Sequence, residues 1–376
     1  MMYWQREYIR EGVAMTLTDT YRLDLPEHGL LGSLLLVISG AQATGYGQGG
    51  GDWRIIDKIS KVEVILDGAT VCKSLTGKQL AALAVLDQGV MMPDAWNNYA
   101  TNTQWCYLLI NFGRMLHDLD FGLDLARYNN VELRITNTAA AAQFSQLSLG
   151  VQAHYLRDAS AGQFGGYMRS EEWRRWTTVA AAIQYNDLPT EHIIRRVVLQ
   201  AVPAVDGSYV EKTGMHNLME DIEFSLDTGQ TRIYKGGLDE LMREVYLEMG
   251  RPLIAAGSAY MTADKGVNIS LGYVLGGAWG AGSQDGAGAA TVATFESARS
   301  SYTQKPETYE ADSPIGFVFV GMAPHLCVPF RFDQSPSPSD WLDPRGRATV
   351  QLNITTRNHA DAASGVNAIV LDRLVP

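Results

Sequence analysis

The sequence predicts a mainly β protein made of two related sandwiches in tandem. Three observations support this prediction: most segments alternate apolar and polar residues, a strand–turn–helix block recurs about 160 residues further along, and 376 residues suffice for about two domains. Apolar residues make up 46% and charged residues 19% of the chain, so it holds enough hydrocarbon for sizeable cores and too little charge for a disordered protein.

Period-two alternation predicts half-buried strands along most of the chain. Apolar residues occupy every second position in residues 62–66 and again in residues 131–135. A further strand over residues 147–155 is expected to end the first sandwich. About eight such strands with one short helix between them are compatible with a jelly roll.

Only two segments have a convincing helical period. In residues 75–89, Thr76 and Gln79 have the spacing of a capping box, and Gly89 suits a C-terminal cap. The second helix, residues 236–250, has apolar residues on one face and also ends in a glycine. Each helix follows a predicted strand and a turn.

The two strand–helix blocks belong to a longer series of similar blocks, which occur in the same order in both halves. Collinear blocks of this kind indicate an internal duplication. The pairs are 25–36 with 188–199, 62–68 with 222–228, 75–89 with 236–250, 111–114 with 329–332, and 131–137 with 350–356.

The offset between matched blocks rises from 161 to 218 after the helices, so the second copy carries about 57 extra residues. They fall near residues 255–312, which are rich in Gly and Ala and are expected to form a long surface loop. Residues 45–53 have the composition of a shorter loop of the same type. We therefore expect an N-terminal arm and a first sandwich in residues 1–165, and a second sandwich in residues 166–376.

The net charge of −11 repels phosphate, so direct nucleic acid binding is not expected. A local exception is the N-terminus, where two arginines lie among aromatic residues and could rest on lipid headgroups or on a neighbouring subunit. A short arm packed on its own domain remains an equal alternative. The residues are Tyr3, Trp4, Arg6, Tyr8 and Arg10.

Cys72, Cys106 and Cys327 form no CxxC pair, so they predict buried small hydrophobic side chains, with no disulfide framework or zinc site. The longest apolar run, residues 30–38, is too short to span a bilayer. The first residues lack the pattern of a signal peptide. We expect a protein that is made and assembled in a cytoplasm.

No catalytic signature is present: the sequence has no nucleophile elbow, phosphate loop or dinucleotide fingerprint. A tandem β-barrel could be a bicupin, but the seven histidines include no His-x-His pair for its metal. His28 and His192 lie in matched blocks and are interpreted as turn residues. We predict no catalytic, cofactor-binding or metal-binding residues, no cofactor and no enzymatic activity.

Asp118, Asp120 and Asp124 cluster near Arg114 and Arg127, and an oxygen-rich loop of this kind can hold calcium. The spacing lacks the glycine and the terminal glutamate of an EF-hand loop. A surface network of ion pairs is therefore the preferred interpretation.

The order of strand 62–68, helix 75–89 and segment 108–136 resembles the major capsid proteins of tailless, membrane-containing, icosahedral double-stranded DNA viruses, the lineage of the adenovirus hexon. The resemblance covers about residues 14–157 and 175–376. It implies a double jelly roll, with two tandem eight-stranded jelly-roll sandwiches that each carry a short inserted helix. It also implies a homotrimer that forms pseudo-hexagonal capsomers, tiles an icosahedral shell and is located in the virion.

The partners that the resemblance implies are neighbouring capsomers, minor capsid proteins and, through the N-terminal arm, an internal membrane. Trp53, Trp96, Trp105 and Trp279 are candidate interface contacts, or else ordinary packing residues. A second hypothesis stays open, in which the chain is a carbohydrate-binding or carbohydrate-active tandem β-sandwich and the tryptophans line a sugar groove.

Overall fold

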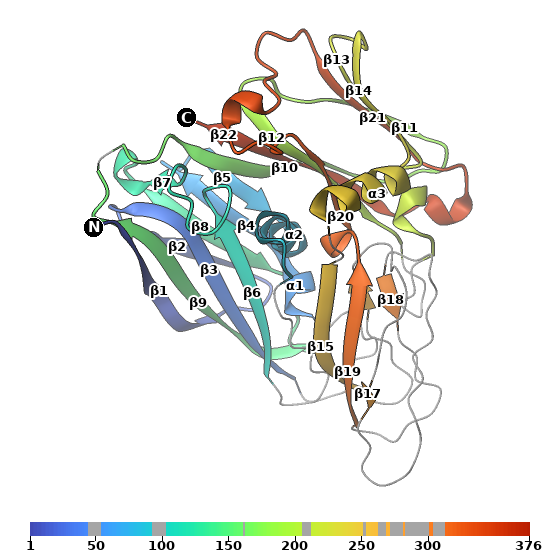
Figure 1. Cartoon of the computed structure of the whole chain (residues 1–376). Helices are drawn as coiled ribbons and strands as arrows, with labels where there is room; N and C mark the ends of the chain where they lie inside the picture. Colours follow the sequence, from blue (N-terminus) through green and yellow to red (C-terminus); the bar gives the residue numbers. More distant parts are fainter. Residues whose placement is uncertain are drawn as a thin grey trace.

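The computed structural model confirms a mainly β fold of two jelly-roll sandwiches (Figure 1). No helix in the described part of the chain is long and apolar enough to cross a membrane. The described residues are 1–43, 54–91, 103–160, 162–204, 212–250, 253–261, 268–270, 281–282, 301–303 and 313–376.

The first sandwich consists of two four-stranded antiparallel arrays. One array has the order β1 (Tyr3–Met15), β9 (Phe144–Arg157), β3 (Leu30–Gln42) and β6 (Thr103–Asn111), with the short β7 (Leu123–Asp124) also paired to β3. The other has the order β2 (Thr20–Asp24), β8 (Val131–Asn137), β4 (Ile59–Leu66) and β5 (Thr70–Leu75), with the one-turn helix α1 (Ile55–Lys58) before β4.

The second sandwich repeats this topology strand for strand, so the predicted duplication is confirmed. One array has the order β10 (Tyr167–Thr177), β22 (Val366–Val375), β12 (Ile193–Val202) and β20 (Cys327–Arg331). The other has the order β11 (Ile183–Asp187), β21 (Val350–Thr355), β13 (Asp221–Leu226) and β14 (Thr231–Gly236).

Three irregularities of strand register also recur, and bulges are features that related structures retain. The register shifts lie at Tyr8/Arg10 and Glu172/Arg174, at Leu31/Ser33 and Ile194/Arg196, and at Val64/Ile65 and Phe224/Ser225. One predicted match needs correction. Asn111 lies opposite Ser33 and Arg331 lies opposite Arg196, so the equivalent residues of β6 and β20 are 220 apart and not 218.

Both predicted helices are confirmed, as α2 (Gly77–Gln88) and α3 (Leu238–Met249). The capping box of α2 is formed: the Thr76 hydroxyl accepts from the Gln79 amide at 3.2 Å, and the Gln79 side-chain oxygen accepts from the Thr76 amide at 3.0 Å. Gly89 ends α2 in the left-handed region, with φ of 70°, which glycine adopts at little cost.

A parallel pairing joins the two sandwiches. Lys73 and Ser74 of β5 lie opposite Ser170 and Glu171 of β10, so one eight-stranded sheet runs through both halves. The core cluster of the first sandwich also includes four buried residues of the second sandwich, which are Tyr167, Val198, Cys327 and Val370. The two halves therefore share a sheet and part of a core.

Residues Tyr3–Met15, expected to belong to an N-terminal arm, form the edge strand β1 and pair with β9 along their length. The predicted insertion follows α3. Its strands β15 (Leu253–Met261) and β19 (Ser313–Gly321) form an antiparallel ladder, and β17 (Ala281–Gly282) pairs with β19. The short strands β16 (Asn268–Ser270) and β18 (Ser301–Thr303) pair with each other. The loop expected at residues 45–53 lies outside the described residues.

Deleting residues 276–292 is expected to leave the subunit folded. Among the described residues, none in 276–292 belongs to the core cluster of either sandwich. The described part of this segment is β17, which lies at the edge of a small sheet. Shortening a surface loop changes its closure entropy little, so the free energy of unfolding should change by less than about 1 kcal/mol. Urea unfolding followed by circular dichroism measures this, and loss of the cooperative transition would contradict it.

Candidate functional site: a buried polar row between the sandwiches

A row of polar residues crosses the shared sheet where the sandwiches meet. Strand register places one such residue on each of five neighbouring strands, which are Lys73 on β5, Ser170 on β10, Asp372 on β22, Arg196 on β12 and Arg331 on β20. The first four are buried. Because buried polar groups are costly unless they are paired, the contacts within this row decide its effect on the fold.

Hydrogen bonds connect the first four residues of the row without a break. The Lys73 ammonium donates to the Ser170 hydroxyl at 2.8 Å, and that hydroxyl donates to an Asp372 carboxylate oxygen at 2.7 Å. The other Asp372 oxygen accepts from Nε and Nη2 of Arg196, at 3.0 and 2.9 Å. This chain of contacts connects a strand of the first sandwich to three strands of the second.

The register shift in β12 adds a second arginine to the same place. Arg195 is the extra residue between Ile194 and Arg196, and its Nη1 lies 3.4 Å from Asp372. A bulge of this kind lets adjacent side chains reach one site, which alternation along a regular strand forbids.

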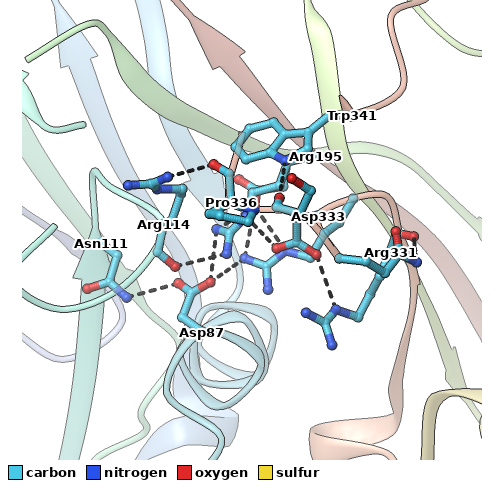
Figure 2. Close-up of polar contacts among 12 residues, drawn as sticks. Asp87, Asn111, Arg114, Arg195, Arg331, Asp333, Pro336 and Trp341 are labelled. Atoms are coloured by element: carbon cyan, nitrogen blue, oxygen red, sulfur yellow. Dashed lines mark hydrogen bonds and ion pairs between the residues drawn. The ribbon is translucent and has the colours of Figure 1, made fainter. Parts of the chain in front are cut away.

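Two more carboxylates reach the arginines from other elements (Figure 2). Asp87, at the end of α2 in the first sandwich, binds Arg195 at 3.0 Å and also pairs with Arg196, and it accepts from Asn111 at 2.9 Å. Asp333, which follows β20, binds Arg195 Nε at 2.8 Å. Figure 2 marks the contacts of Arg195 with Asp87 and Asp333 by dashed lines.

The six residues Lys73, Arg195, Arg196, Asp87, Asp333 and Asp372 comprise three cations and three carboxylates, and the partly buried Arg331 adds a further ion pair to Asp333 at 3.2 Å. Burial by itself would raise the pKa of Asp372, but the neighbouring Arg196, Arg195 and Lys73 lower it to about 2. Burial lowers the pKa of Lys73. We call these six residues the junction cluster. Its arrangement suits a structural clamp that fixes one sandwich against the other.

Sequence reasoning did not identify the junction cluster, although a signal was present. Arg195 and Arg196 interrupt the apolar run IIRRVVL, and Asp372 interrupts the run AIVLDRLV. Charged residues within a predicted buried strand need partners. Both arginines pair with Asp372 from the neighbouring strand, and their further partners Asp87 and Asp333 come from α2 and from the loop after β20, which no local pattern connects.

The acidic cluster after β6 is an ion-pair network, as predicted, but Asp118 at its centre is buried and not on the surface. Arg114 binds Asp118 through two nitrogens, both at 2.7 Å, and reaches Asp120 at 2.5 Å, while Arg127 lies 3.7 Å from Asp124. Arg114 also donates to the Pro336 carbonyl at 2.7 Å. This network therefore makes a second link between the sandwiches. No group of residues suited to a metal ion is found among the described residues.

The other singled-out residues lie apart from the junction cluster. His28 and His192 occupy turns before β3 and β12, as interpreted from the sequence. All three cysteines are buried, as predicted. Trp105 is exposed on β6, and Trp53, Trp96 and Trp279 lie outside the described residues.

A pocket of about 390 Å³ also lies at the junction. Each basic side chain in its lining is neutralised by a carboxylate, since Lys61 pairs with Glu63, Lys78 with Asp57, and Arg175 with Glu172. Its lining, as described, contains no aromatic residue on which a sugar ring could stack. The pocket therefore favours neither an anion site nor a sugar groove.

A buried histidine, His325, lies at the junction between the sandwiches. Its short 3-10 turn, η3 (Pro324–Leu326), packs against α2, and its backbone has a left-handed φ of 49°. Burial, together with the positive Arg54 and Lys78, lowers the pKa of His325 to about 3, although Asp57 opposes this shift. The imidazole is thus neutral in the folded protein at pH values where the unfolded chain takes up a proton.

Wild-type protein is expected to lose more stability than His325→Asn between pH 6.5 and pH 4.5. A histidine with a folded pKa below its unfolded value of about 6.5 stabilises the fold above pH 6.5, and this contribution declines as the pH falls toward about 3. Asparagine tolerates the left-handed backbone and does not titrate. Urea unfolding at the two pH values tests this, and equal losses in both proteins would contradict it.

No family model matches the sequence, and no curated protein matches it. Solved structures do match. The STIV MCP, from Sulfolobus Turreted Icosahedral Virus, has a TM-score of 0.59 at 10% identity and is aligned over 100% of this chain and 97% of that chain. PBCV-1 VP54 has a TM-score of 0.57 at 10% identity and is aligned over 100% of this chain and 94% of that chain.

The major capsid protein P2 from Bacteriophage PM2 gives a TM-score of 0.52 at 10% identity, over 100% of this chain and 98% of that chain. Identities this low establish the fold alone. With two jelly rolls of identical strand order joined through a shared sheet, the chain has the double jelly-roll fold of these major capsid proteins.

Proposed function

We propose that the protein is a viral major capsid protein that forms trimeric, pseudo-hexagonal capsomers and tiles an icosahedral shell. The observation that carries this proposal is the full-length likeness to capsid proteins of three viruses, which includes both sandwiches. A subunit of a shell must transmit load between neighbours, and the junction cluster supplies the rigid connection between the two sandwiches that this role needs.

We further propose a domain division, a set of partners and a location for the protein. The chain divides into residues 1–165 and 166–376, and its partners are two further copies, neighbouring capsomers and minor capsid proteins. It is located in the virion after assembly in the host cytoplasm, and it has no enzymatic role. The exposed Tyr3, Tyr8 and Arg10 of β1 are the residues available for contact with an internal membrane.

Size-exclusion chromatography with light scattering tests the proposal on the full chain. We expect a particle of three 41.2 kDa chains, and electron micrographs should show pseudo-hexagonal particles. Co-expression with the neighbouring genes should then give closed shells. A monomer that binds glycans on an array would instead support the carbohydrate-binding alternative.

A further inference from the structure

A small cluster of rings holds the start of β1, which is the edge strand of its sheet (Figure 1). The centres of the Trp4 and His117 rings are 5.0 Å apart, and His117 stacks on His154 with 5.6 Å between ring centres. Trp4 also crosses β9 to reach β3, where a Cβ atom on Gly32 would lie 2.5 Å from the Trp4 ring. We call Trp4, His117 and His154 the histidine clasp, because they connect β1, β9 and the loop after β6.

The loop after β6 is fixed in place and offers the clasp no unpaired carboxylate. His117 has a left-handed backbone, with φ of 63°. Its neighbour Asp118 accepts from the Arg114 amide at 2.9 Å and from the Arg114 side chain at 2.7 Å, and Asp120 binds the same side chain. His117 therefore has a defined position and no anionic partner in its own loop.

The strands around the clasp present positive charge to it and no carboxylate. Arg6 of β1 lies opposite His154 in the strand register. β3 contains no charged residue. Alternation along the strands places Glu7 and Arg157 on the other face, where they lie 3.7 Å from each other. The clasp therefore faces one cation and no anion on these strands.

The two imidazole rings are packed against uncharged groups. Nδ1 of His154 lies 3.1 Å from the Ser33 hydroxyl, and its Nε2 lies 3.4 Å from the Gln152 side-chain oxygen. Nε2 of His117 is buried, and no group in the described part of the chain bonds to it. Burial and the positive Arg6 lower the pKa of both histidines, and for His154, where the His117 ring adds to the effect, the pKa falls to about 4. Both rings are therefore neutral near pH 7.

We propose that the histidine clasp is an acid-operated switch, which holds the first half of β1 on the sandwich at neutral pH and releases it when both imidazoles are protonated. Protonated His117 and His154 join Arg6 in one cluster of three positive charges without a carboxylate, and release relieves this repulsion. It also exposes the rings to water, which solvates their charge. The switch belongs to the single chain, so the inference does not rest on the proposed capsomer. In a shell that meets acid, it would free an N-terminal segment while the rest of the subunit stays folded.

Hydrogen exchange of the full chain, measured by mass spectrometry at pH 6.5 and pH 4.5, tests the switch. A histidine whose pKa is lower in the closed clasp than in the released segment stabilises the closed form above pH 6.5, and this contribution is lost as the pH falls toward about 4. From His154 alone, with pKa values of about 4 when closed and 6.5 when released, the protection factors of residues 3–8 should fall about fortyfold. Protection factors already correct for the pH dependence of intrinsic exchange. Residues 193–202 should remain more protected at both pH values, because the release is local.

His117→Asn/His154→Asn is the test variant, because asparagine does not titrate and tolerates the left-handed backbone at His117. Its residues 3–8 should show little change in protection between the two pH values, and each single variant should show an intermediate fall. His28→Asn is the matched control, since His28 is exposed in the turn before β3, and it should behave as the wild type. A fortyfold fall that persists in the double variant overturns the inference. Equal protection of residues 3–8 and 193–202 in the wild type at pH 4.5 also overturns it, since the release would then not be local.

Discussion

Asp372→Ala is expected to destabilise the protein by about 3–5 kcal/mol, because it leaves buried cations without their shared carboxylate. Arg196 would lose two hydrogen bonds, Arg195 an ion pair, and Ser170 its acceptor. Asp87 cannot replace this partner for Lys73, which reaches the cluster through Ser170. Urea unfolding at pH 7, followed by circular dichroism, measures the loss.

Asp343→Ala is the matched control for Asp372→Ala. Asp343 also binds an arginine, Arg345, at 2.8 Å, but both side chains are about half exposed and water replaces the lost contact. Little change in stability is expected. Similar losses in the two variants would mean that the junction cluster contributes no more than a surface ion pair.

The pH dependence of the wild type should agree with this role of Asp372. Its pKa is about 2 in the folded protein against 3.8 for the free side chain. A carboxyl group with a lowered folded pKa stabilises the fold above its unfolded pKa, and the contribution is lost as the pH falls from about 3.8 toward 2. The Asp372→Ala variant should lack this component of acid unfolding.

The repeated architecture was predictable because it depends on local signals. Capping residues and a closing glycine located α2, alternation located β4 and β8, and comparison of the halves located their equivalents. The same comparison placed the insertion between α3 and β20. Hydrophobic periodicity and cap chemistry act within a few residues, so a single sequence carries them in full.

The contacts between sandwiches were not predictable, because they join residues far apart in sequence. Asp87 meets Arg196, and Lys73 reaches Asp372 through Ser170. The N-terminal residues were also placed incompletely: an arm was expected, with packing on its own domain as one alternative, and only the pairing with β9 shows that Tyr3–Met15 form a strand of the first sandwich. Edge strands depend on a partner that local sequence does not specify.

Leu133→Asp is expected to unfold the protein, with a loss of about 4 kcal/mol or more. Leu133 is fully buried on β8, between Leu23 of β2 and Val64 of β4, and an aspartate there would be a buried charge without a partner. Leu133→Met retains the volume and should cost less than about 1.5 kcal/mol. Soluble yield and hydrogen exchange measured by mass spectrometry distinguish the two variants.

The duplication extends this prediction to Leu352, the equivalent of Leu133 on β21, which is also fully buried. Leu352→Asp should be as damaging as Leu133→Asp. Because the shared sheet and Val198, Cys327 and Val370 connect the two cores, either variant should remove exchange protection from both sandwiches together. Protection that persisted in the unmutated sandwich would mean that the halves fold independently, and that the junction cluster aligns two stable units without joining them into one cooperative structure.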